Sequence, residues 1–309
     1  TMEDIRLEQM DCHLLVSIAS FLGSGDLVQL SLTSRLFGGT PTSSAAAASR
    51  VCRGTNASGA NVDNDAVERN WSIVNKAARS LLAETQTEEE KACLRMLVGQ
   101  SYIRIYSELE QLRRPLTFDR VFGPGMSRVA SDVGSGVVRS SWDLSMAMSN
   151  HVMRAGKHYA VFSGSGISRD AWVGVIRPIK GWWERRLPDF PPWDLSYRAE
   201  LRQERAERWG NNYGDVDCCM LGPWNGACMW VDFNSNEDCH FDRDWHGLER
   251  YETAGGDVVG LLLDLDEGTL ALYKNGVRVG EMKKGLCGEY CWMVCLGGYN
   301  GERAVYIKR

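Results

Sequence analysis

Cysteine and histidine side chains gather in one part of the chain, where thiolates and imidazoles could bind a metal ion. The members of this group are Cys218, Cys219, Cys228, Cys239, His240 and His246. They lack the paired Cys-x-x-Cys spacing of zinc ribbons and knuckles. A second set, Cys287, Cys291 and Cys295, repeats every fourth residue, but Cys291 to Leu296 has the apolar content of a strand. We therefore interpret these thiols as core or surface residues, with a metal protein as the alternative.

The chain has five histidines and many serines, so an enzyme is a second class to weigh. A nucleophile needs a base within hydrogen-bond reach and a third group that orients this base. The sequence has no nucleophile elbow, and Ser163 to Gly166 lacks the third glycine and the helix of a phosphate loop. Asp264 and Asp266 could form an acid–base pair, but they flank a predicted turn. We predict no catalytic residue, no cofactor and no bound metal.

Residues 180–212 form a long stretch that is rich in tryptophan and arginine. These two residue types often dominate the binding energy of protein interfaces, and long loops in compact domains are commonly functional. We predict that the stretch binds a protein ligand through Trp182, Trp183, Arg185, Arg186 and Trp193. The alternative is that its tryptophans fold back over the open side of their own domain. Glu200 to Arg208 alternates in charge, which predicts a short, solvated helix.

The elements that would position these residues are clearest within residues 251–282. Val258 to Leu265 is an almost unbroken apolar run, which is typical of a strand buried in a sandwich. Asp266-Glu267-Gly268 supplies a turn, and Leu270 to Lys274 follows as a second strand. Asn275-Gly276 favours a type I′ hairpin turn, because both residues tolerate a positive φ. The residues after this turn, up to position 282, are predicted to return as a third strand.

This order of blocks resembles the core signature of the SPRY family: Gly-Asp-apolar-Gly, an apolar strand ending in Asp, an acidic turn with Gly, an aromatic strand, then Asn-Gly. Two further blocks are similar to the family pattern, namely Gly156 to Tyr159 with the strand that follows it, and the Gly-Val strand Ala171 to Ile176. The resemblance covers residues 116–309. It implies a bent antiparallel β-sandwich that binds a protein or peptide ligand through its loops and does no catalysis.

Apolar residues near the N-terminus follow helical spacing and form one stripe. Gly23-Ser24-Gly25 is predicted to break the helix, and Asp26 to cap a second helix. Together with Ser34-Arg35-x-Phe37 these features resemble the F-box, although Met10-Asp11 stands where that motif usually has Leu-Pro. The resemblance implies docking on the Skp-type adaptor of a Skp–cullin–F-box ubiquitin ligase. The adaptor-binding residues would be Leu14, Leu15, Ile18, Phe21, Leu22, Leu27 and Leu30.

The sequence therefore predicts an α+β multidomain chain, with an α-helical segment followed by an antiparallel β-sandwich of SPRY type. Its parts are an F-box-like helical motif (1–38), a flexible linker of small and polar residues (39–64), connecting helices (65–115) and the SPRY domain (116–309). Thr87 to Glu90 predicts a capping box within the connecting helices. The alternative to a ligase adaptor is a SPRY scaffold whose N-terminal helices serve self-packing or dimerisation.

Net charge and hydropathy restrict the classes of binding partner and the cellular location that we expect. A net charge of −5 and a pI near 5.7 argue against a general nucleic-acid binder, whose surface is basic. No apolar run approaches the roughly 20 residues that span a bilayer, and acidic residues interrupt the apolar segment nearest the N-terminus, unlike a secretory signal. Ten cysteines without such a signal indicate a reducing compartment. We therefore expect a cytoplasmic or nuclear protein. Because the chain opens with Thr1-Met2, the sequence is compatible with a further segment upstream of it.

Overall fold

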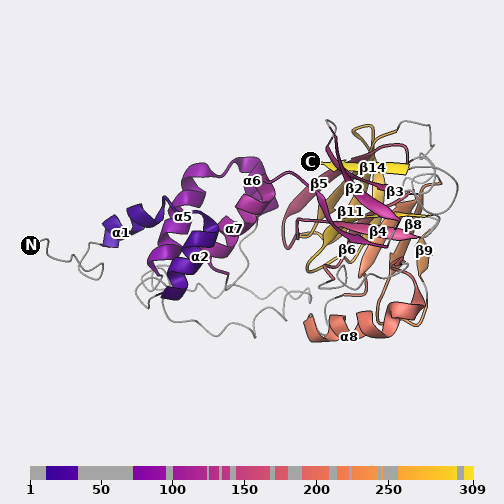
Figure 1. Cartoon of the computed structure of the whole chain (residues 1–309), viewed down its shortest axis with the longest axis horizontal. Coiled ribbons are helices and arrows are strands. Elements are labelled where there is room, and N and C mark those ends of the chain that lie inside the picture. Colours follow the sequence, from indigo (N-terminus) through magenta and orange to yellow (C-terminus); the bar gives the residue numbers. More distant parts are fainter. Residues whose placement is uncertain are drawn as a thin grey trace, which may run out of the picture. The chain divides into compact units, whose positions relative to one another are not determined.

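The computed structural model describes residues 12–33, 72–94, 100–123, 125–131, 134–139, 144–167, 171–179, 190–208, 214–222, 225–237, 239–242, 245, 257–297 and 303–309. The chain divides into two compact units, Thr1–Arg114 and Pro115–Arg309 (Figure 1). The described part of the first unit is helical, and the second consists mainly of antiparallel strands. The predicted α+β class, helices followed by a sandwich, is confirmed. None of the described helices has the length and apolar content needed to cross a membrane.

The helical unit contains α1 (Cys12–Ala19), α2 (Ser24–Thr33), α5 (Ile73–Thr85), α6 (Glu88–Cys93) and α7 (Tyr102–Arg113). Apolar side chains from α1, α2 and α5 share one core, whose buried members are Leu15, Ala19, Leu27, Ile73, Val74, Ala77 and Ala78. Side chains of α7 pack against the border of this core. The α1–α2 hairpin is therefore part of the same packed unit as the later helices.

Two helices of this unit, α2 and α7, begin where a side chain from another helix accepts backbone N–H groups. On α7, the Glu110 carboxylate accepts the backbone N–H of Ser24 at 3.2 Å, and also the Ser24 hydroxyl, at the start of α2. On α5, Asn75 Oδ1 accepts the backbone N–H of Tyr102 at 2.6 Å, at the start of α7. Such groups satisfy N–H donors that the first turn leaves free. The prediction of Asp26 as the cap of the second helix is wrong: α2 begins at Ser24, and Asp26 lies in its first turn.

The predicted capping box at the start of α6 is confirmed. The Thr87 hydroxyl accepts the Glu90 N–H at 3.2 Å, and the Glu90 carboxylate accepts the Thr87 N–H at 2.8 Å. Arg113 on α7 donates to the same carboxylate at 2.7 Å. This hydrogen bond from Arg113 is the main cause that lowers the pKa of Glu90 to about 2. The box therefore starts α6 and also ties it to α7.

Within its described residues, the second unit is a sandwich of two seven-stranded sheets with antiparallel pairing. Sheet A has the order β1 (Phe118–Phe122), β4 (Ser145–Ser149), β13 (Cys291–Leu296), β6 (Ala171–Ile176), β7 (Cys218–Gly222), β8 (Ala227–Val231) and β9 (His240–Asp242). Sheet B has the order β12 (Val277–Lys284), β11 (Thr269–Lys274), β10 (Val259–Asp264), β5 (Lys157–Ser163), β14 (Arg303–Lys308), β3 (Gly134–Arg139) and β2 (Met126–Ser131).

The three strands predicted from residues 251–282 are present as β10, β11 and β12, paired in sequence order. Asn275 and Gly276 adopt φ values of 50° and 81°, which fit the type I′ turn expected of this pair. The last strand runs to Lys284, beyond the predicted end at Met282. This hairpin supplies one edge of sheet B.

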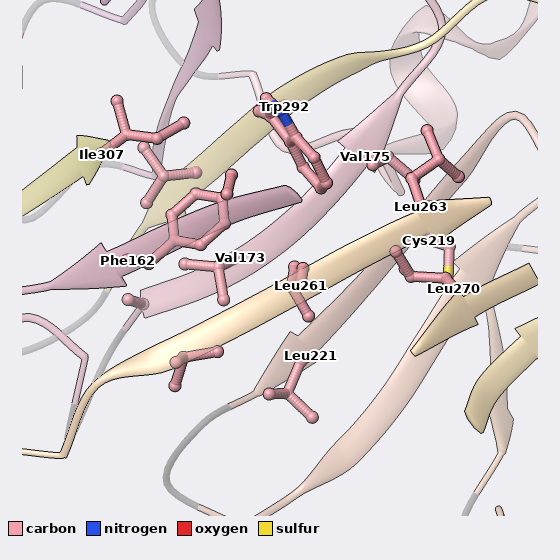
Figure 2. Packing of buried hydrophobic residues seen from close by; sticks show 14 of the residues in the cluster. Phe162, Val173, Val175, Cys219, Leu221, Leu261, Leu263, Leu270, Trp292 and Ile307 are labelled. Carbon is pink, nitrogen blue, oxygen red and sulfur yellow. The ribbon is translucent and has the colours of Figure 1, made fainter. Parts of the chain in front are cut away.

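The sandwich has two apolar cores, one on each face of sheet A. Between the sheets, side chains such as Phe162, Leu261 and Trp292 interdigitate (Figure 2), and the rings of Phe162 and Trp292 meet edge to face at 6.1 Å. On the other face of sheet A lies a second buried cluster, which we call the outer core. Its members are Phe122, Met146, Met148, Ile176, Ile179, Phe190, Leu201, Cys218, Met220, Met229, Val231, Phe233, Cys291, Met293 and Cys295. Burial on both faces explains why these strands are continuously apolar in sequence.

Two buried histidines lie close together where β4 leads into β5. The rings of His151 and His158 are 5.5 Å apart. His158 Nε2 lies 2.8 Å from the Ala155 carbonyl oxygen, whereas neither ring nitrogen of His151 has a hydrogen-bond partner within the described structure. Burial lowers the pKa of His151 to about 3 and that of His158 to about 4. Both are therefore neutral in the folded protein at neutral pH.

We predict that this pair makes the sandwich sensitive to acid. Below the ordinary histidine pKa of 6.5 the unfolded chain binds protons that the folded one does not, so stability falls as the pH is lowered from 6.5 towards 4. The expected loss is about 1.4 kcal/mol per histidine for each pH unit. Urea unfolding at several pH values measures how the free energy of unfolding changes with pH. In the His151→Leu variant this slope should be shallower than in the unmodified chain by about 1.4 kcal/mol per pH unit. Equal slopes for both proteins would contradict the prediction; between pH 7 and 8 the slopes should agree.

Candidate functional site

The stripe predicted to bind the adaptor is divided by the fold. Leu15 and Leu27 are buried in the core of the helical unit, at 3% and 0% exposure. Leu22 and Leu30 are partly buried against the same core. The side chain of Leu14 lies outside the described residues. The four leucines that pack in or against this core therefore hold the helices of the unit together.

The remaining residues of the stripe face solvent. Ile18 is 47% exposed and Phe21 is 90% exposed, and Val28 on α2 joins them as an exposed apolar side chain of the hairpin. The Phe21 N–H donates to the Ile18 carbonyl at 3.2 Å, so both residues lie on the same turn at the end of α1. A docking surface on the α1–α2 hairpin would consist of these exposed side chains rather than of the whole stripe.

Of the residues predicted to bind the ligand, Trp193 lies in the described structure, while Trp182, Trp183, Arg185 and Arg186 fall outside it. Trp193 is partly buried against the outer core, with its ring centroid 6.0 Å from that of Trp172. It is followed by the short helix η4 (Leu195–Tyr197) and by α8 (Arg198–Arg208). This part of the stretch covers its own sheet, and contact of Trp193 with a ligand stays a prediction.

The helix predicted within residues 200–208 is present as α8, which begins earlier, at Arg198. It is not a fully solvated helix: Arg198, Leu201 and Arg205 are buried. The reason is the spacing of its arginines, at positions 198, 202, 205 and 208, which places them on one face of a helix. Figure 1 shows α8 alongside the strands of the sandwich.

All four of these arginines bind backbone carbonyl groups of the sandwich unit, and Arg205 donates to the carbonyl of Gly214. Arg198 donates to the Asp232 carbonyl at 2.6 Å. Arg202 donates to the Asn236 side-chain oxygen at 2.9 Å and to the Ser235 carbonyl at 3.4 Å, both on the loop after β8. Arg208 donates to the carbonyl of Pro178, directly after β6. The helix is therefore attached through guanidinium groups rather than through a broad apolar face.

The fourth arginine enters a fully buried charge cluster. Asp217 Oδ1 accepts from Arg177 Nε at 2.5 Å and from Arg205 Nε at 3.0 Å, and all three side chains have no exposed surface. The other carboxylate oxygen of Asp217 accepts the backbone N–H of Phe233 at 2.7 Å. Arg177 lies 5.1 Å from the ring centre of Tyr290, and burial raises the pKa of that phenol. Two cations thus share one carboxylate.

No sequence pattern predicted this cluster. Arg177 follows an apolar strand and Asp217 precedes one, so each resembles an ordinary charged residue at a strand end. The signal that was present is the helical spacing of the arginines in α8, which indicates one charged face needing acceptors. Nothing in the sequence identifies Asp217 as that acceptor, because it lies beyond the end of the helix, 12 residues from Arg205 and 40 residues from Arg177.

The cysteines of the metal alternative are dispersed among packed strands. Cys219 and Cys228 lie between the sheets with their sulfur atoms 3.7 Å apart, and Cys218 and Cys291 lie in the outer core. The hydrogen bond to Cys228, together with burial, raises the pKa of the Cys219 thiol, and burial raises that of Cys291 to about 12. Such thiols are poor nucleophiles and poor ligands. Among the residues described, no three potential ligands gather around one point.

Comparison with known proteins adds similarities to solved structures. No family model and no curated protein matches the chain. The crystal structure of the SPRY domain of human HERC1 is 14% identical, with a TM-score of 0.38 over 60% of this chain and 94% of that chain. The TRIM65 PSpry domain is 16% identical, with a TM-score of 0.38 over 63% and 93%. A human SPRY domain is 14% identical, with a TM-score of 0.35 over 60% and 97%.

The charge cluster generates a prediction about stability. Asp217→Asn removes the carboxylate from two buried cations and should lower the free energy of unfolding by about 3–5 kcal/mol. Arg205→Met leaves Asp217 and Arg177 as a balanced pair and should cost no more than about 1.5 kcal/mol. Asp215→Asn, at an exposed position nearby, is the matched control and should change stability by less than about 0.5 kcal/mol. Chemical denaturation measures all three, and a larger loss in Arg205→Met than in Asp217→Asn would contradict the prediction.

Proposed function

We propose that this chain is a protein-interaction adaptor of the SPRY type. The sandwich unit would bind a segment of a substrate protein, and the α1–α2 hairpin would bind the Skp-type adaptor of a cullin ubiquitin ligase. Substrate and ligase would thereby be brought together without any chemistry by this chain. The proposal combines the SPRY-like sequence blocks with the exposed apolar residues of the hairpin.

Support for the sandwich half comes from where the SPRY-like blocks lie. Gly156 to Tyr159 leads into β5, and β5 pairs directly with β10, the strand of the long signature block. The Gly-Val block is β6, in the centre of sheet A. The matching blocks are thus the buried strands that hold the loops of the sandwich. Rigid strands that carry variable loops are a usual arrangement for binding.

The exposure of Phe21 is the main support for the proposed binding of the Skp-type adaptor. A phenylalanine side chain gains about 1.5–3 kcal/mol when it is buried, and Phe21 is 90% exposed at a site where the F-box-like stripe continues past the core. Ile18 extends the apolar surface on the same turn. Exposed apolar groups of this kind are typical of protein interaction sites when they cluster.

The alternative function is a SPRY scaffold without a ligase role. It is favoured by Leu15 and Leu27, which the motif would use for docking but which are buried within the helical unit. In that case the hairpin would serve only to complete the core with α5. The two functions differ in whether the exposed side chains, rather than the buried ones, matter for binding.

The test is therefore a substitution of exposed residues only. Phe21→Ser should weaken binding to the Skp-type adaptor by about 30-fold or more, the effect of losing a hot spot worth about 2 kcal/mol. Co-purification followed by calorimetric titration of the full-length chain would measure it. Removing the hairpin, or changing Leu15, would be uninformative because both open the core shared with α5.

Val277→Ser is the control for this experiment, since Val277 is a 69% exposed apolar residue of the sandwich unit. It should leave adaptor binding unchanged. Circular dichroism should show the same helix content for Phe21→Ser as for the unmodified chain. Equal adaptor affinity in both variants, or no affinity in any of the proteins, would overturn the ligase half and leave the scaffold function.

A further inference from the structure

Helix α8 contributes little apolar surface to the unit that it covers. Leu201 is its one side chain in the outer core, and its alanines, Ala199 and Ala206, are exposed. Its outward face carries Glu200 and Glu207. An isolated helix of this length is marginal in water. The position of α8 therefore depends on its arginine contacts.

Near the buried C-terminal half of α8, two arginine cations face a single carboxylate. Asp217 is already satisfied by Arg177 and by the Phe233 N–H, and Arg205 adds a second cation. Arg205 Nη2 donates to the Gly214 carbonyl, but Arg205 Nη1 is buried and has no hydrogen-bond partner in the part of the chain that the structure describes. A buried donor without an acceptor and a buried charge without its own counter-ion are both unfavourable. If α8 moves away, Asp217 and Arg177 remain as a balanced pair.

What lies beneath α8 defines what could replace it. The carbonyl groups of Asp232 and Ser235 accept arginine N–H groups. Next to them lies the outer core, which is rich in methionine and loses the cover of Leu201 when the helix leaves. Methionine side chains adapt to different apolar partners. This surface therefore fits a helix that offers arginine on one turn and apolar groups on the adjoining ones.

We propose that α8 is a displaceable cover and that the substrate segment bound by the sandwich is an amphipathic helix that takes its place. This helix presents arginines to the carbonyl groups used by Arg198 and Arg202, and an apolar residue at the position of Leu201. At the position of Arg205 it carries an apolar residue, which removes the surplus buried cation. The inference rests on the proposed binding of a protein segment by the sandwich and names the class of that segment.

A synthetic peptide can represent both helices. One peptide copies residues 195–208, a second copies them with the Arg205→Leu change, and a third is a scramble of the second. Fluorescence anisotropy would measure their affinity for the full-length chain and for its Leu201→Ser variant, in which the cover is weakened and the receptor groups are kept. The Arg205→Leu peptide should bind at least tenfold more tightly than the native-sequence peptide. It should also bind the Leu201→Ser variant at least tenfold more tightly than the unmodified chain.

Hydrogen exchange supplies a second readout that needs no peptide. Amides of α8 should exchange at least a hundredfold faster than those of β13 in the unmodified chain, and faster still in Leu201→Ser, while β13 stays unchanged. The proposal is overturned if α8 exchanges as slowly as β13, or if the scrambled and Arg205→Leu peptides bind equally. These results do not depend on adaptor binding, so a failure here is distinguishable from loss of the ligase half. If a substrate protein binds the sandwich without changing hydrogen exchange in α8, the sandwich is still an interaction domain. That result would reject only the proposed binding site under α8.

Discussion

One buried carboxylate, that of Asp217, connects three segments of the sandwich unit that are far apart in the sequence. It joins the exit of β6 through Arg177, the loop after β8 through the Phe233 N–H, and α8 through Arg205. Its own backbone N–H donates to the Val231 carbonyl at 2.8 Å, so the residue also continues the pairing of β7 with β8. A buried charge is tolerated only with good partners. The exit of β6 and the loop after β8 therefore cannot shift independently of one another, whereas α8 only adds a second cation to a carboxylate that these two segments already satisfy.

The same constraint explains why a highly charged helix lies on an apolar sheet. Sheet A is buried on both faces, so its outer face requires a cover. Phe190 and Trp193 supply part of that cover with apolar surface. Arginine side chains supply the rest, because their long apolar stems can lie along a core while their guanidinium groups reach carbonyl oxygens. A cover attached in this way is specific in position yet contributes little hydrophobic stabilisation, which is a suitable combination for a surface that exchanges partners.

Local features were predictable from the sequence, and tertiary ones were not. The turn at Asn275-Gly276 and the capping box at Thr87 depend only on neighbouring residues, and both are present. By contrast, the start of α2 depends on Glu110, which lies 86 residues from Ser24. No local pattern encodes such a partner, so Asp26 was the best local candidate and was wrong. The outward face of α8 was predictable from charge, but its buried arginines required knowledge of Asp217.

The N-terminal stripe shows how the same limit affects function. Helical periodicity places Leu15 and Ile18 on one apolar stripe, but it cannot say how wide the receiving core is. The core with α5 covers Leu15 and Leu27, and the stripe extends beyond it to Ile18 and Phe21. A partner that binds at Ile18 and Phe21 would add apolar contacts at the edge of this core and would not replace any of the helices that form it. The residues that hold the helical unit together are therefore different from the exposed residues at which we propose binding, so the proposed binding can be tested while the fold is kept.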